Sequence, residues 1–357
     1  MKREFLTPEP ITVEIRNAAG DVRVDLVDAT TDGPSASHLT TVEVLSAGGS
    51  QPLGFLDDIF KAVNSGRLGE ELRSAFGRRD SGDGTGGGPA AWFGGSGPFE
   101  GRDHGGAGGF GGREAGATGA DEDPADRVRI EHTEPRADGR RAIVVVDTDP
   151  ARSGWRSSFT IRVRAPRGSG VRAQTQSADV AVTGVADRLE IRTASGAVAV
   201  DRVTEKAVVQ TASGAVSVTE AADADLRTAS GRIGADHLDS RVVAHSTSGD
   251  IRIDRLSGDG SVRTVSGDVR LAEVGAGRLE AVSVSGDVEI GLRPGVAAAV
   301  NLSTVSGSTD SDLPISDRLG GADRAPDAAE TITAEPDLDL RVTTTSGDIG
   351  LRRAVTV

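Results

Sequence analysis

The sequence predicts an all-β protein: a single-stranded β-solenoid of about 18-residue coils, with an N-terminal β cap and a glycine-rich disordered insertion. Three observations support this prediction. A Ser-Gly pair recurs at nearly constant spacing, apolar and polar residues alternate around it, and the 357 residues include 48 Gly, no Cys and only 3% aromatic residues. The core must therefore be built from Val, Ile, Leu and Ala, which disfavours an ordinary compact enzyme.

The repeat is marked by the Ser of each Ser-Gly pair, with Ser177 as a degenerate first copy. Successive gaps are 18, 18, 17, 18, 18, 19, 21 and 40 residues, so the last interval holds an insertion; the positions are Ser177, Ser195, Ser213, Ser230, Ser248, Ser266, Ser285, Ser306 and Ser346. A hexapeptide helix would need an aliphatic residue at every sixth position, but steps from Leu189 reach Ser195 and Asp201. Propeller blades need about 40 residues each, so a stacked solenoid is favoured.

Alternation within each unit predicts two short strands around the Ser-Gly corner. The position three after the Ser is aliphatic in seven units: Val198, Val216, Ile233, Ile251, Val269, Val288 and Ile349. The position two before it carries a hydroxyl in eight units: Thr193, Thr211, Thr228, Ser246, Thr264, Ser283, Thr304 and Thr344. We expect each hydroxyl to bond to the coil above or below, and glycine to provide a positive φ or a close approach at the corner.

Residues 1–45 and 127–172 are predicted to form the two parts of the β cap, followed by the solenoid at 173–357 with a loop insertion at 314–337. Residues 11–27 fit the repeat template with a turn at Ala19-Gly20, and further strand signals lie at 38–45, 128–132, 142–147 and 159–165. A cap of this kind covers the end of the rod and its exposed strand edge.

An insertion at 46–126 interrupts the pattern. Phe55, Ile59, Phe60 and Val63 recur at helical spacing, which predicts a short amphipathic helix, and 17 Gly in residues 81–120 predict a disordered tract. The helix either packs on its own cap or docks on a partner or a membrane surface. Anionic membrane is the least favoured partner, because the insertion has a net charge of about −6 and lacks a basic face.

The stretches "FTIRVRAPRGSGVRAQTQSADVAVTGV", "TASGAVAV", "TVSGDVRL", "SVSGDVEI" and "DLRVTTTSGDIGLRR" resemble the bacterial putative adhesin family, a β-strand-repeat domain of unknown function. The opening "PEPITVEIRNAAGDVRV" is similar to that family's first strand pair. The resemblance covers about residues 8–45 and 125–353. It implies a β-solenoid fold and, from some relatives, a link to cell-envelope stress; it implies no catalytic motif.

The search for chemistry predicts no catalytic, cofactor-binding or metal site. Asp250, Asp268 and Asp287 follow the corner glycine in consecutive coils and should form a column about 5 Å apart, as solvated turn residues or, alternatively, as calcium ligands. "GDGTGG" at 82–87 lacks the strand and helix of a phosphate loop. The five histidines show no metal-ligand spacing; we expect His245 to face outward near Arg227 and Arg263.

The sequence therefore predicts a non-catalytic scaffold or binding module that requires no cofactor. The alternative is a carbohydrate-binding or polysaccharide-active β-helix protein, which a deep groove lined by convergent carboxylates or aromatics would favour. A formal charge of −14 disfavours nucleic acid as a partner, which leaves an unidentified protein or envelope component. No export signal and no apolar run of about 18 residues is found, so we expect a cytoplasmic protein, at most peripheral to the membrane.

Overall fold

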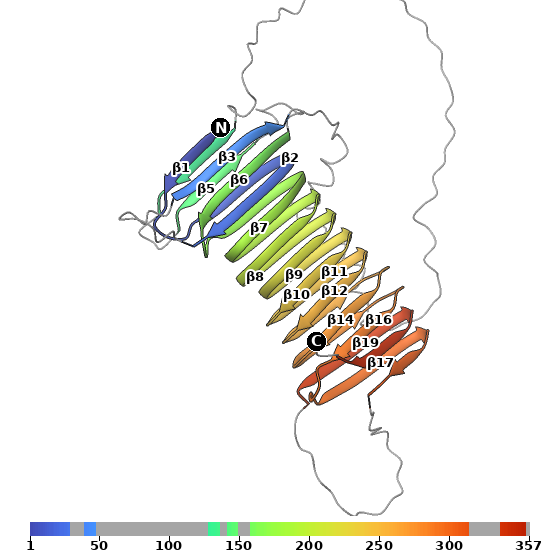
Figure 1. Cartoon of the computed structure of the whole chain (residues 1–357). Helices are drawn as coiled ribbons and strands as arrows, with labels where there is room; N and C mark the ends of the chain where they lie inside the picture. Colours follow the sequence, from blue (N-terminus) through green and yellow to red (C-terminus); the bar gives the residue numbers. More distant parts are fainter. Residues whose placement is uncertain (29–38, 48–127, 136–140, 149–157, 314–335, 355–357) are drawn as a thin grey trace, which may run out of the picture.

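The computed structural model describes residues 1–28, 39–47, 128–135, 141–148, 158–313 and 336–354, and these form 20 β-strands and no helix. All 20 strands belong to one continuous hydrogen-bonded sheet that winds into a rod of stacked coils (Figure 1). The predicted all-β solenoid is confirmed. The helix predicted within 46–126, the glycine-rich tract and most of the 314–337 loop lie outside the described residues.

The central rod has two straight sides joined by corners, and neighbouring strands on each side are parallel. Its strands are β7 (Gly170–Ser195), β8 (Val198–Ser213), β9 (Val216–Ser230), β10 (Ile233–Leu238), β11 (Arg241–Ser248), β12 (Ile251–Leu256), β13 (Asp259–Arg263), β14 (Val269–Val274), β15 (Gly277–Val282) and β16 (Val288–Leu292). The register steps by one sequence repeat: Ile233 lies beside Val216 on one side and Ile251 on the other. Each coil is therefore one copy of the repeat.

The predicted aliphatic columns form the core of the rod. Val198, Val216 and Ile251 are all at most 2% exposed, and the buried apolar residues from both ends of the rod belong to one cluster. Each coil covers the inward side chains of its neighbours. Stacking is required, because a single coil buries too little apolar surface to offset its loss of conformational freedom.

The Ser-Gly corners stack at a distance that only glycine permits. A Cβ on Gly214 would collide with the carbonyl oxygen of Gly196, and the same collision with the glycine of an adjacent coil recurs at Gly231, Gly249, Gly267, Gly286, Gly307 and Gly347. Some of these corners also have a positive φ, such as 133° at Gly196, but Gly249 does not. Close backbone approach is therefore the requirement that all the corners share.

The hydroxyl column is buried as predicted except at Thr304 in the end coil, which is only partly buried, and its predicted bonding is only partly correct. Thr175 Oγ1 donates to Thr193 Oγ1 of the next coil at 2.8 Å. Within the described part of the chain, four other hydroxyls of this column have no hydrogen-bond partner: those of Thr211, Thr228, Ser246 and Ser283. Adjacent coils are about 4.8 Å apart and a hydrogen bond spans about 2.8 Å, so two hydroxyls meet only when their rotamers turn them toward each other.

At the N-terminal end the coils do not follow sequence order. Strand β2 (Thr12–Val27) bends at Gly20 and lies in parallel between β7 and a coil made of β5 (Ile143–Asp147) and β6 (Ser158–Pro166). Three further strands add antiparallel neighbours beyond that coil: β1 (Lys2–Leu6), β3 (Leu39–Ala47) and β4 (Arg129–Thr133). Strands β2, β5 and β6 are thus wound as coils, and β1, β3 and β4 close this end.

The C-terminal end is rearranged in the same way. Strands β17 (Ala298–Ser306) and β18 (Thr309–Ser311) form the last coil, but β19 (Leu338–Ser346) and β20 (Ile349–Arg353) lie between this coil and β15 and β16. Among the described residues β17 pairs only with β19, and β18 only with β20. The final segment of the chain is therefore sandwiched, and an earlier segment forms the end of the rod.

Candidate functional site

A shallow depression of about 380 Å³ lies near the N-terminal end of the rod. Its charged lining comes from β2, β7, β8 and the residues just before β5: Glu14, Arg141, Arg172, Asp187, Arg188, Glu190 and Glu205. Four carboxylates and three guanidinium groups thus share one small surface, which makes it the strongest candidate site on the described residues.

The floor of the depression is a column of alternating charge. The coil register places Glu14 beside Arg172, and Glu190 lies one repeat further on. Arg172 bridges both, with guanidinium nitrogens 3.5 Å from Glu14 Oε1 and 3.0 Å from Glu190 Oε2. Arg192 reaches the other oxygen of Glu190 at 3.0 Å. Both carboxylates are therefore held by arginines from neighbouring positions.

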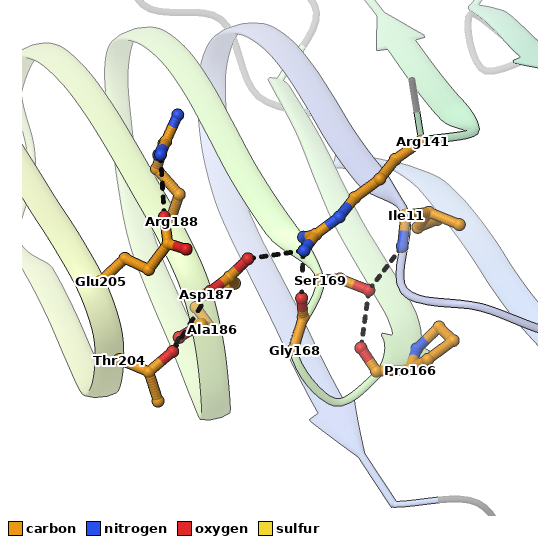
Figure 2. Close-up of polar contacts among 10 residues, drawn as sticks. All are labelled: Ile11, Arg141, Pro166, Gly168, Ser169, Ala186, Asp187, Arg188, Thr204 and Glu205. Carbon is orange, nitrogen blue, oxygen red and sulfur yellow. Dashed lines mark hydrogen bonds and ion pairs between the residues drawn. The ribbon is translucent and has the colours of Figure 1, made fainter. Parts of the chain in front are cut away.

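The rim joins the N-terminal segment, the cap and the first coils of the rod (Figure 2). Arg141 donates to the carbonyl oxygen of Gly168 at 3.1 Å and to Asp187 Oδ2 at 2.7 Å. The fully buried Ser169 hydroxyl donates to Pro166 O at 2.6 Å and accepts from the Ile11 amide at 3.1 Å. Both hydrogen bonds of the Ser169 hydroxyl are thus made to the backbone, which it ties together across Ile11 and Pro166.

The outer wall carries a further ion pair. Arg188 donates to Glu205 at 2.8 Å, and the Thr204 hydroxyl lies 3.3 Å from Asp187 Oδ1. Together with the floor and rim, these contacts give each of the four carboxylates an arginine partner. The depression therefore has a nearly balanced charge, with a guanidinium group beside every carboxylate.

The structure brings the predicted aspartates into one column and gives them a role that the sequence analysis missed. The amide of Asp268 donates to Asp250 Oδ1 at 3.2 Å, and the amide of Asp287 donates to Asp268 Oδ1 at 3.0 Å. The same bond links the Asp348 amide to Asp287 Oδ1 at 2.8 Å. Each of these carboxylates holds the corner of the next coil, and the signal for this was the Asp directly after the corner Gly in these four units.

These bonds bear on the calcium alternative. The described residues contain no group of three or more His, Cys, Asp or Glu side chains that could hold a metal ion. In the aspartate column one oxygen of each linked carboxylate already accepts a backbone amide. A structural role is therefore the better supported interpretation of this column.

Among the described residues, two carboxyl groups have a shifted pKa, and both values are lowered. A hydrogen bond from Arg293 to Glu273, 2.6 Å long, lowers the pKa of that carboxyl below its ordinary value. The pKa of Asp348 is lowered by hydrogen bonds from the backbone amide and then the hydroxyl of Ser308. A general acid active near neutral pH needs the opposite shift.

The predicted neighbours of His245 are confirmed, since it lies between Arg227 and Arg263 in the strand register. Alternate residues of one strand form ion pairs at Glu190–Arg192 and Asp225–Arg227, at 3.0 Å and 2.7 Å. In the cap, His132 packs on Phe5 with ring centroids 5.1 Å apart. These histidines are spread over separate strands and join no shared site.

The family model described as Toastrack DUF4097 matches residues 160–352, more than half of the chain. The chain belongs to the Toastrack family. The Toastrack match runs from β6 to β20, so it includes the whole central rod and the rearranged C-terminal coils but not β1 to β5. The family has no established function, and the resemblance found in the sequence is confirmed at that level.

One solved structure similar to this Toastrack protein is described as a "putative cell adhesion protein" from Clostridium sporogenes. It shares 6% identity, the match covers 99% of each chain, and the TM-score is 0.21. A comparison with curated proteins finds no match.

Among the described residues, no helix has the length and apolar character needed to cross a bilayer.

Proposed function

We propose that this Toastrack protein is a non-catalytic scaffold or binding module whose rigid, ion-paired rod presents fixed surfaces to a partner. One observation carries the proposal: outward-facing charges are paired between successive coils along the rod. Arg202 meets Glu220 at 2.5 Å, Arg263 meets Glu280 at 2.8 Å, and Arg270 meets Glu289 at 3.3 Å. Each exposed pair contributes at most about 1 kcal/mol to stability, so its main effect is to fix where charges lie.

The depression is the best candidate for the binding surface. Its floor and rim are set by Arg172 and Arg141, each held in place by carboxylates, so a partner meets a preformed pattern of charge. Preorganised side chains lose little conformational entropy on binding. A protein segment carrying both acidic and basic groups fits this surface, because it could pair with charges of either sign.

The alternative, a carbohydrate-binding or polysaccharide-active protein, is favoured by the four carboxylates of the depression. Glycoside hydrolysis requires one of its two carboxyl groups to keep a proton near neutral pH. Arginine partners on all four oppose this, and the described lining contains no aromatic side chain on which a sugar ring could stack.

The same proposal extends to partner class and location. Support for a protein or envelope component comes from the charge of −14, which opposes binding to nucleic acid. The sequence resemblance to relatives in envelope stress systems supports a cytoplasmic location at the membrane periphery.

In-cell crosslinking with mass spectrometry tests the proposal by locating contacts on the rod. We expect partner crosslinks around the depression that are lost in Arg172→Glu and kept in Arg278→Glu. The control arginine lies in β15, is 79% exposed and pairs with Asp339 at 3.2 Å. Equal crosslinking in both variants contradicts the binding site, and turnover of polysaccharide by the purified protein would favour the alternative.

A further inference from the structure

The two ends of the rod differ in how they are finished. At the N-terminal end, the antiparallel strands β1, β3 and β4 cover the coil of β5 and β6. At the other end, core positions are exposed: Val300 continues the column of Leu340, yet Val300 is 38% exposed and Leu340 is fully buried. Leu302 is likewise only partly buried, whereas Val342 beside it is fully buried.

The strand at the open end also lacks the usual protection against pairing. Ala298–Ser306 reads AAVNLSTVS, with no charged residue and no proline over nine residues. The strands at the closed end read KREFL in β1, with three charged residues, and RIEHT in β4, with two. Charged side chains and prolines are how proteins keep an exposed strand edge from pairing, so β17 is an edge open to association.

We propose that this end is a self-association surface, at which β17 pairs with β17 of a second copy. The N-terminal end is closed by charged strands and offers no matching edge, so like ends must meet, which gives a closed twofold dimer rather than a filament. The proposal is independent of the binding role assigned above to the depression, which lies near the opposite end of the rod.

A second copy fits because β17 is self-complementary. Leu302 is its middle residue, and antiparallel pairing with Leu302 opposite itself places Val300 opposite Thr304 of the second copy. Val305, which is 77% exposed, then lies opposite Ala299 of the second copy. Every inward position meets an inward position, and two molecules that each carry a charge of −14 approach through an uncharged strand.

The area available is sufficient for a specific but modest interface. Nine residues at about 3.3 Å each make an edge roughly 30 Å long, and a two-sided coil is about 20 Å across with its side chains. Contact between two such ends buries about 1,200 Å² in total, the lower limit for stable protein interfaces. We therefore expect a dimer that forms reversibly with concentration.

Analytical ultracentrifugation of the full chain, from about 1 to 100 μM, tests the dimer. We expect Val300→Lys to raise the dimer dissociation constant by about 10-fold or more, since an inward-pointing lysine on an edge strand blocks pairing. The matched control is Leu6→Lys, which changes an exposed leucine (69%) in β1 at the closed end and should leave the constant unchanged. A wild-type monomer throughout this range, or a dimer lost only in Leu6→Lys, overturns the proposal.

Single cysteines test the register, because the natural chain has none. Leu302→Cys should form a disulfide-linked dimer on mild oxidation, since opposite residues of an antiparallel pair lie about 4.5–5.5 Å apart. Ser306→Cys should not, because in this register its sulfur lies roughly 25 Å from the same residue of the second copy. Equal crosslinking at both positions indicates random collision and overturns the register. Strong amide protection of β17 in a monomer shows that the chain's own residues cover the edge and overturns the dimer.

Discussion

Corner glycines are where single residues control the stacking of the rod. Gly249 of one coil lies so close to the carbonyl oxygen of Gly231 that any Cβ would collide with it. The sequence already showed that glycine is required at this position. It could not show which of two reasons applied, because a positive φ and a close backbone approach both require glycine.

Gly249→Ala should therefore lower the free energy of unfolding by about 1–3 kcal/mol, since the backbone of two coils must separate to admit one methyl group. The control is Gly234→Ala, whose added Cβ would lie 3.8 Å from its nearest neighbour, Val216 O. That substitution should leave stability unchanged or raise it by up to about 1 kcal/mol. Urea unfolding of both variants measures the difference, and similar losses in the two would contradict the stacking argument.

Asp348 gives the corner ladder a predictable response to acid. Hydrogen bonds from Ser308 lower its pKa in the folded protein below the ordinary value of 3.8. Folding is therefore favoured by this group above that value, and the contribution is lost as the pH falls through the lower folded pKa. Melting temperature measured against pH should fall less steeply below pH 3.8 in Asp348→Asn than in the natural protein. Parallel curves for the two proteins would show that Asp348 makes no such contribution.

Within an element, the hydroxyl column shows what a repeat pattern can and cannot predict. Unbroken Ser or Thr at one position correctly indicated an inward-facing column, which is buried in every coil but the end coil, where Thr304 is only partly buried. Its bonding depends on side-chain rotamers, which no spacing encodes, so Thr193 bonds to the Ser195 carbonyl at 3.0 Å while the Thr211 hydroxyl has no partner among the described residues.

The two threonines should respond in opposite ways to the same change. Thr193→Val removes a made hydrogen bond and should destabilise the protein by about 1–2 kcal/mol. Thr211→Val replaces a buried, unbonded hydroxyl with a methyl group and should be neutral or stabilising by up to about 1 kcal/mol. Chemical denaturation of both variants measures the contrast; an equal loss would mean that Thr211 is bonded in solution.

The candidate site shows the same division between pattern and geometry. Local ion pairs such as Asp225–Arg227 could be predicted, because alternate residues of a strand share a face. The depression could not, since Arg141 reaches Asp187 only after the cap and the first coils are placed side by side. That contact joins segments 46 residues apart in the sequence, and no repeat register relates them.

At the scale of the whole molecule, the sequence predicted the coils but not their order. The register columns fix which residues lie side by side but not which coil follows: Val288 lies beside Ile349, and Thr309 of the next copy in sequence lies on the far side of Ile349. The structure uses this freedom at both ends: β2 lies between β7 and the coil of β5 and β6, and β19 lies between β15 and β17. Segments near the chain ends thereby gain neighbours on both sides, which should reduce fraying.

This order predicts an unequal response to two deletions of comparable kind. Removing residues 337–357 takes away β19 and β20. Because these two strands hold β17 and β18 onto the rod, the coil of β17 and β18 should detach as well. Removing 297–336 instead joins Val296 to Asp337, and β19 should then follow β16 directly as the new end coil. Hydrogen exchange with mass spectrometry should show residues 298–306 unprotected in the first variant and residues 338–346 protected in the second. Protected 298–306 in the truncated chain would mean that the last coil can stack on β15 and β16 unaided, and that the sandwiched segment is not what holds it.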